Sequence, residues 1–160
     1  MGATLPGPIS AWEKARASEA KWAERFMAMA HLVATWSKDE STKVGCCLVD
    51  SANRVISLGF NGPARGVLDG YKDRDQKIRR TLHAESNALS FAHRDVVGCT
   101  AYVTHPPCSN CAAMLIQRGV AKVVFPPPSE DFMSRWLISY TESMEMFSEA
   151  GVQVKFIGEE

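Results

Sequence analysis

The chain has 160 residues, of which 46% are hydrophobic and 22% charged, a composition typical of a globular domain. Its 18 basic residues balance its 18 acidic residues, so the formal net charge is zero at neutral pH. Proteins that hold long nucleic acids by their phosphates usually carry an excess of positive charge. The composition therefore argues against a nucleic-acid partner and favours a small-molecule substrate.

The cysteines and the absence of targeting signals predict a cytoplasmic setting. Five cysteines are an odd number, and no secretory signal precedes them, so a disulfide framework is not expected. No apolar run approaches the roughly 20 residues that a membrane span needs. We therefore expect a protein of a reducing compartment that does not associate with membranes.

The first elements in chain order are a lead-in and an amphipathic helix. Residues 1–18 are predicted to form a flexible lead-in ahead of a single domain over residues 19–160. From about Lys21, apolar residues recur every three or four positions, which predicts a helix with one apolar face. The residues of this stripe are Trp22, Phe26, Met29, Val33 and Trp36.

A hairpin is predicted next. Residues 44–49 form a short apolar run suited to a buried strand, and residues 54–60 form a second strand after a turn at residues 50–53. The hairpin ends in Gly59-Phe60-Asn61-Gly62, a glycine-rich turn whose backbone can approach a ligand closely. On spacing alone, Asn61 is either a simple turn residue or a ligand contact.

A charged segment over residues 63–82 is predicted to be a loop. Five of the nine residues from Lys72 to Arg80 are basic. Such a run can receive a phosphate, but it is more often the solvated face of a helix. The sequence leaves both interpretations open.

The remainder of the chain alternates helices with strands, which predicts an α/β fold with a mixed or mostly parallel sheet and helices on both faces. The predicted helices cover residues 83–93, 108–118 and 131–150, and the predicted strands cover residues 100–104, 120–125 and 152–157. Gly119 and Gly151 are expected to end the last two helices.

Four residues in this second half carry a chemical signature. His83 and Glu85 form a His-x-Glu motif, and Cys108 and Cys111 follow Pro107 in a Pro-Cys-x-x-Cys motif. A catalytic Zn²⁺ takes three protein ligands and keeps a fourth position open. We expect His83, Cys108 and Cys111 to be these ligands, and Glu85 to be the catalytic acid and base. This combination is the signature of zinc-dependent nucleobase deaminases.

The spacing of the motifs also predicts their local structure. Cys108 and Cys111 are one helical turn apart, and a helix that begins after Pro107 stabilises thiolates at its N-terminus. His83 and Glu85, two residues apart, would point to different sides of a regular helix. Both can face one metal ion only at the start of a helix, so two helix N-termini are predicted to meet at the zinc.

Other functions share parts of this signature. A purely structural zinc would need a fourth ligand, such as Cys46, Cys47 or Cys99, but would not need an acid beside its histidine. A non-catalytic zinc or nucleotide-binding module is a further alternative, against which the intact Glu85 counts. Deaminases of free nucleosides or of tRNA adenosine carry the same motifs, and the zero net charge argues against the tRNA substrate.

Over about residues 22–157 the chain resembles deoxycytidylate deaminases of the cytidine deaminase superfamily. The matching stretches are Ser37-Lys38-Asp39, Gly59-Phe60-Asn61-Gly62, His83-Ala84-Glu85-Ser86-Asn87-Ala88 and Tyr102-Val103-Thr104-His105-Pro106-Pro107-Cys108-Ser109-Asn110-Cys111. The resemblance implies a three-layer α/β/α sandwich with a five-stranded mixed sheet. It also implies hydrolytic conversion of dCMP to dUMP and ammonia, a step that feeds thymidylate synthesis.

The resemblance extends to substrate and effectors. It implies that Asn61 contacts the sugar, that Lys38 and Arg65 contact the nucleotide or its phosphate, and that Ala84 also belongs to the substrate site. Family members are homo-oligomers, so a hexamer or a dimer is expected. Several are regulated by dCTP and dTTP together with Mg²⁺, which the resemblance adds as expected effectors.

Two positions depart from the family pattern. Pro63-Ala64 stands where relatives often have a bulky apolar residue and a proline, and Leu68 stands where an acid is common. If this loop borders the base pocket, the smaller residue makes room for a C5-substituted base. The sequence therefore raises the hypothesis that 5-methyl-dCMP is a substrate, with dTMP as its product.

Overall fold

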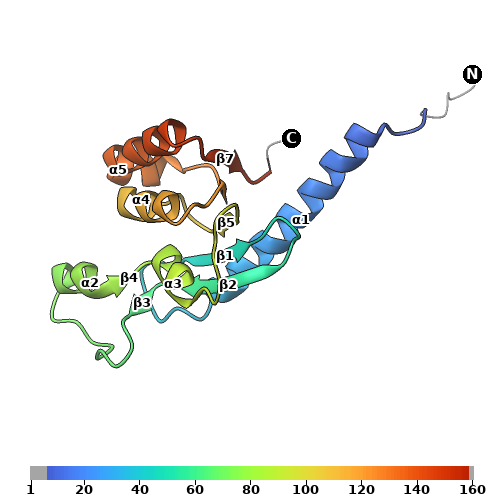
Figure 1. Ribbon diagram of the computed structural model, residues 1–160. Helices are drawn as coiled ribbons and strands as arrows, with labels where there is room; N and C mark the ends of the chain where they lie inside the picture. Colours follow the sequence, from blue (N-terminus) through green and yellow to red (C-terminus); the bar gives the residue numbers. More distant parts are fainter. Residues whose placement is uncertain (1–6, 159–160) are drawn as a thin grey trace, which may run out of the picture.

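A five-stranded mixed sheet forms the centre of the protein (Figure 1), whose computed structural model describes residues 7–158. The strands lie in the order β2–β1–β5–β6–β7. β1 is antiparallel to both of its neighbours, whereas β5, β6 and β7 are parallel, so the predicted mixed sheet is confirmed. The strands are β1 (Gly45–Val49), β2 (Val55–Phe60), β5 (Thr100–Val103), β6 (Lys122–Phe125) and β7 (Gln153–Phe156).

Helices cover both faces of the sheet and complete the three layers. The four long helices are α1 (Ala11–Ala34), α3 (Ala84–Phe91), α4 (Ser109–Gln117) and α5 (Glu130–Glu149). All of β1 is buried, and its alternate residues point to opposite faces. Cys46 and Leu48 belong to the core with α3, α4 and α5, whereas Cys47 and Val49 belong to the core with α1.

α3 packs so closely on β2 that a glycine is required at the contact. A Cβ atom on Gly59 would lie 2.3 Å from the carbonyl oxygen of Ala84 and 2.4 Å from the backbone nitrogen of Ala88. The hydroxyl of Ser57 also donates a hydrogen bond of 2.7 Å to the carbonyl of Ala88. These contacts fix the start of α3, where the His-x-Glu motif lies.

α5 holds the start of α4 in a similar way. The backbone N–H of Ser109 donates to the hydroxyl of Ser139 at 2.9 Å, and the hydroxyl of Ser143 donates to the carbonyl of Pro107 at 2.9 Å. α5 is interrupted at Trp136, whose φ of −125° and ψ of 17° are not helical. The sequence did not indicate this break.

α1 begins at Ala11, ten residues before the predicted start, which corrects the prediction of an irregular lead-in over residues 11–18. Ser10 and Glu13 form a capping box, in which each side chain accepts a hydrogen bond from the other's backbone N–H. The first turns of α1 extend away from the sheet (Figure 1). Residues 1–6 lie outside the described part of the chain. None of the helices described is both long and apolar enough to span a membrane.

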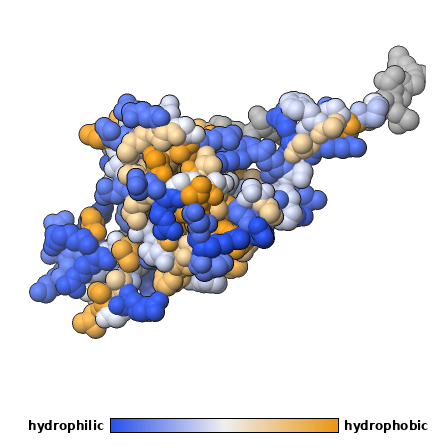
Figure 2. Space-filling model, viewed as in Figure 1, coloured by the Kyte–Doolittle hydropathy of each residue, from blue (hydrophilic) through white to orange (hydrophobic). Residues whose placement is uncertain are grey.

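The charged segment before His83 is also more regular than predicted. It contains a short hairpin of β3 (Gly62–Pro63) and β4 (Thr81–Leu82), with α2 (Arg74–Arg80) between these strands. The side chain of Asp73 caps α2 by accepting from the backbone N–H of Gln76 at 2.8 Å. α2 has no buried residue, and hydrophilic side chains cover it in Figure 2. The prediction of a loop here was wrong, because the basic run forms a solvated helix.

Candidate active site

Two helix N-termini meet at the proposed metal site, as the motif spacing predicted. His83 is the N-cap residue of α3, and Cys108 is the N-cap residue of α4. Both have extended backbone conformations, with ψ values of 159° and 167° respectively. An N-cap residue lies outside the regular helix, so its side chain can point to the same place as a side chain of the following turn. This local geometry brings His83 beside Cys108 and Cys111.

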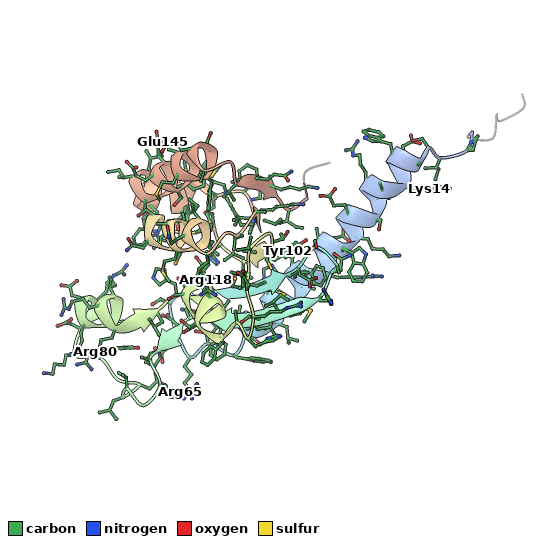
Figure 3. All side chains as sticks on the ribbon, in the orientation of Figure 1. Lys14, Arg65, Arg80, Tyr102, Arg118 and Glu145 are labelled. Atoms are coloured by element: carbon green, nitrogen blue, oxygen red, sulfur yellow. The ribbon has the colours of Figure 1, made fainter. Side chains whose placement is uncertain are left out.

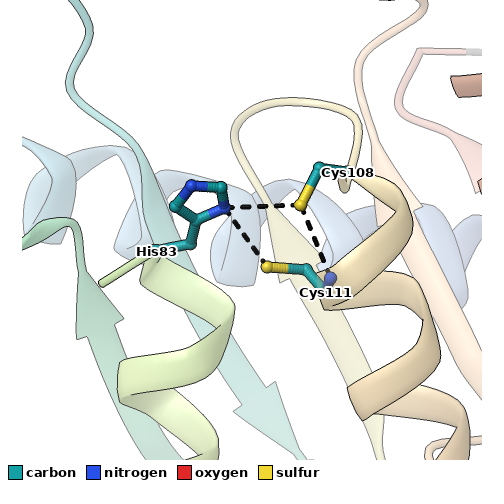
Figure 4. Close-up of side chains that lie close together, drawn as sticks. All are labelled: His83, Cys108 and Cys111. Carbon is teal, nitrogen blue, oxygen red and sulfur yellow. Dashed lines mark hydrogen bonds between the residues drawn. The ribbon is translucent and has the colours of Figure 1, made fainter. Parts of the chain in front are cut away.

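The three candidate ligands form a triangle of the size that zinc requires (Figure 4). Nδ1 of His83 lies 3.4 Å from Sγ of Cys108 and 3.4 Å from Sγ of Cys111. With ordinary Zn–S and Zn–N bond lengths, a tetrahedral ion places such nitrogen and sulfur atoms about 3.5 Å apart. One imidazole nitrogen and two sulfurs are also a preferred donor set for zinc. The residues present therefore fit the ion.

No fourth protein ligand joins this group among the residues that the structure describes. The metal-ligand cluster consists of His83, Cys108 and Cys111. Cys46 and Cys99 are instead buried in one hydrophobic core, and Cys47 in the other. The open fourth position is the arrangement of a catalytic zinc site and counts against a structural one.

Electrostatics at the start of α4 favour a thiolate. Hydrogen bonding from Cys111 outweighs burial and, with the contribution of His83, lowers the pKa of Cys108 to about 4. The backbone N–H of Cys111 also points at Sγ of Cys108 at 3.5 Å. The interaction with Cys108 and then burial raise the pKa of Cys111. The start of α4 thus favours a thiolate at Cys108.

Glu85 lies in the first turn of α3, close to the triangle but outside the ligand set. Glu85 is buried, with only 4% of its surface exposed. Burial raises the pKa of Glu85, because a carboxylate loses its hydration in the interior, although its own backbone N–H and His83 oppose the shift. A carboxyl group with a raised pKa is better suited to accept a proton and return it during a reaction.

A cavity of about 880 Å³ opens beside the triangle. Five of the residues predicted for the site line it: Asn61, His83, Ala84, Glu85 and Cys108. The cavity extends between the start of α3 and the first turns of α5, with α2 contributing to its wall. The metal site therefore faces a space large enough for a mononucleotide.

Asn61 is buried in the cavity wall and holds its shape. Its Oδ1 accepts from the backbone N–H of Val44 at 2.9 Å, and its Nδ2 donates to the carbonyl of Thr42 at 2.9 Å. A carboxamide has two donor and two acceptor positions, so one of each stays available for a ligand. The structure gives Asn61 a supporting role, and the sugar contact stays a prediction.

Lys38 and Arg65 do not line the cavity, although the resemblance placed both in the substrate site. The ammonium group of Lys38 is 3.3 Å from the carboxylate of Asp69, and its side chain is 81% exposed. The guanidinium of Arg65 stacks over the ring of Phe91, and Figure 3 shows it on the loop after β3. The fold of this chain therefore does not bring Lys38 and Arg65 together with the predicted site residues that line the cavity.

The cavity is also lined by cationic residues that the sequence did not single out. Arg74 and Lys77 come from α2, and Arg135 comes from α5. The first two belong to the basic run for which a phosphate role had been considered, but no signal in the sequence pointed to Arg135. His105 also lines the wall, and its Nδ1 is buried without a hydrogen-bond partner in the described structure.

A His/Cys/Cys triangle with an open position, a buried acid beside it and an α/β/α sandwich together define a zinc-dependent deaminase. The chain belongs to the family described as the cytidine and deoxycytidylate deaminase zinc-binding region, which matches residues 20–126. The chain is thus a deaminase of this family and an enzyme of the hydrolase class.

Similar proteins agree with this assignment. The chain is 51% identical over 139 residues to an uncharacterized deaminase in the luxG 3′ region of Aliivibrio fischeri, covering 86% of this chain and 94% of that one. It is 38% identical over 121 residues to the human deoxycytidylate deaminase, covering 70% and 68% respectively. The dCMP deaminase of cyanophage S-TIM5, solved with dCMP and dUMP, superposes with a TM-score of 0.71 at 26% identity, covering 85% of this chain and 96% of that chain.

Proposed function

We propose that the protein deaminates deoxycytidine monophosphate to dUMP and ammonia. The observation that carries this proposal is the triangle of His83, Cys108 and Cys111 with Glu85 buried beside it in a nucleotide-sized cavity. The human and cyanophage relatives named for dCMP support the choice of substrate. Cationic residues on the cavity wall suit a substrate that carries a phosphate.

The chemistry requires a water molecule and a proton carrier. Zinc, when bound by His83, Cys108 and Cys111, lowers the pKa of water to about 7 and so supplies a nucleophile at neutral pH. Glu85 accepts one proton from the attacking water and delivers it to N3 of the cytosine ring. It then carries the remaining hydroxyl proton to the N4 amine. The C4–N4 bond breaks, ammonia leaves, and the water oxygen becomes the C4 carbonyl of uracil.

The hypothesis of a C5-substituted substrate receives no support from the cavity. Neither Pro63 nor Ala64 lines it. The direct check is turnover of 5-methyl-dCMP by the wild type and by Ala64→Phe. If Ala64→Phe abolishes turnover of 5-methyl-dCMP but not of dCMP, the loop does control the C5 position.

Regulation and assembly are expectations that come from the family. Homo-oligomerisation as a hexamer or a dimer, and control by dCTP and dTTP with Mg²⁺, are checked by light scattering and by kinetics with each nucleotide. A cytoplasmic location also stays a prediction of the sequence.

A substrate panel tests the proposed function. Ammonia release is measured from zinc-quantified protein with dCMP, deoxycytidine, CMP and a tRNA anticodon stem-loop. We expect turnover of dCMP, with deoxycytidine at least tenfold poorer in kcat/KM. Preference for deoxycytidine or the stem-loop would replace the proposal with the nucleoside or tRNA alternative. Bound zinc without turnover of any of them would favour the binding-module alternative.

A further inference from the structure

We propose that Arg74 of α2 and Arg135 of α5 together bind the 5′-phosphate of the substrate. This inference rests on the proposed nucleotide substrate and assigns its phosphate to residues that no comparison indicates. Both residues line the cavity that opens beside the metal triangle. They come from elements that are far apart in the sequence and separate in Figure 1, so they reach the cavity from different parts of its wall.

Arg74 lines the cavity but has no ion-pair partner in the described structure, unlike Lys77 and Arg135. It makes no ion pair or side-chain hydrogen bond with any residue from 7 to 158. A guanidinium has five N–H donors in a planar fork that matches two oxygens of a phosphate. An unpaired arginine in the wall of a ligand cavity thus offers an unused binding group.

Lys77, the other cation of α2 in the cavity wall, is already committed. Its Nζ lies 2.8 Å from Oδ1 of Asp39 and 3.3 Å from the hydroxyl of Ser41. The side chains of Lys77 and Asp39 are only 26% and 10% exposed. This pair fixes α2 to the loop before β1 and so holds Arg74 at the cavity, while the charge of Lys77 is neutralised by Asp39.

Arg135 is paired more weakly and is available to a stronger anion. It contacts Asp131 one turn earlier on α5, and the two side chains are 57% and 74% exposed. An exposed pair of this kind contributes little to stability. A phosphate offers two charges and several acceptors, so bidentate binding to Arg135 would displace Asp131.

Arg135 also lies outside the zinc-binding region that the family model matches. The family match ends at residue 126, before α5 begins at Glu130. Recognition of the phosphate is therefore divided between α2 and a helix beyond the matched region. Lys38 and Arg65, the positions suggested by the resemblance, do not line this cavity.

The test compares Arg74→Ala, Arg135→Ala and their double variant with Arg79→Ala. Arg79 is an exposed residue of α2 that does not line the cavity, so it controls for loss of positive charge. We expect each cavity variant to raise KM for dCMP by about 10- to 100-fold, the range for a lost charge-assisted hydrogen bond. The kcat/KM for deoxycytidine, and all constants of Arg79→Ala, should change less than twofold.

Binding of inorganic phosphate to the zinc-loaded protein, followed by calorimetry, separates the two proposals. Weaker phosphate binding in both cavity variants supports the phosphate site even if the wild type does not deaminate dCMP. An unchanged KM for dCMP in both variants, or an equal loss of deoxycytidine turnover, overturns the assignment. Failure of the wild type on dCMP with intact phosphate binding overturns only the proposed substrate.

Discussion

Nδ1 of His83 lies 3.4 Å from Sγ of Cys108, although 25 residues separate them in the chain. Each residue is the N-cap of its own helix, and the close packing of α3 on β2 and of α5 on α4 holds the two helix starts together. The metal site therefore depends on the whole three-layer architecture rather than on one local motif.

Removing one sulfur should remove the metal. Cys111→Ala leaves two ligands, so we expect zinc to fall from about one ion per chain to below about 0.1 after dialysis. The measurement is metal content by mass spectrometry. Cys47→Ala is the control, because Cys47 is buried on the face of β1 that packs against α1, away from the metal site. Full zinc retention in Cys111→Ala would exclude this ligand set.

A methyl group at Gly59 should disturb the site by displacing the start of α3. The new Cβ would meet the backbone of Ala84 and Ala88 at 2.3–2.4 Å. Backbone cannot yield as a side chain can, so we expect Gly59→Ala to lower the free energy of unfolding by about 3 kcal/mol and to reduce zinc content. Gly62→Ala is the matched control, because nothing lies within 4 Å of its Cβ. Equal urea midpoints for the two variants would contradict the packing argument.

The elements nearest the site were predictable because their signals are local. The burial of β1 follows from its apolar run, and the ends of α4 and α5 follow from Gly119 and Gly151, whose φ values are 83° and 72°. The meeting of two helix starts follows from the spacing of His83 and Glu85. The start of α1 was missed because the capping residues Ser10 and Glu13 precede a polar stretch that shows little apolar periodicity.

Other features were not predictable because they arise only in the folded protein. Arg65 and Arg74 lie in the same charged segment, but only Arg74 lines the cavity. This difference depends on where α2 packs, which the sequence does not show. The position of Arg135 depends on the packing of α5 against α4. The carboxamide of Asn61 supports residues that lie 17 and 19 positions away, a relationship that spacing does not reveal.

Asn61→Ala should weaken both the fold and substrate binding while the metal stays. Loss of the carboxamide leaves the N–H of Val44 and the carbonyl of Thr42 without their partners. We expect a loss of about 1–3 kcal/mol in the free energy of unfolding and a higher KM for dCMP, with about one zinc per chain as in the wild type. Urea denaturation, kinetics and metal analysis measure the three effects. An unchanged KM would remove the sugar contact but not the structural role.

The Asp39–Lys77 pair should make stability depend on pH in the acidic range. Burial raises the pKa of Asp39, but hydrogen bonds from Lys77 and from the backbone N–H groups of Thr42 and Ser41 outweigh it and lower the pKa below 3.8. A depressed folded-state pKa contributes stability above the unfolded-state pKa, and this contribution is lost as the pH falls through the folded-state pKa.

The measurement is the difference in unfolding free energy between the wild type and Asp39→Asn at several pH values. We expect about 1–2 kcal/mol between pH 5 and 7, narrowing as the pH falls below 3.8. Asp69→Asn serves as the control, because the Lys38–Asp69 pair is more exposed. A difference that is constant down to acid pH would show that the charge of Asp39 does not contribute.

The most direct test of the central claim is the turnover of dCMP by Glu85→Gln at matched zinc content. Glutamine preserves the shape of the buried side chain but cannot carry a proton, so we expect about one zinc per chain and a kcat reduced by about 10²- to 10⁴-fold. Ammonia release and metal analysis on the same samples give both quantities. A zinc-loaded Glu85→Gln protein with a kcat close to that of the wild type would contradict the role assigned to Glu85.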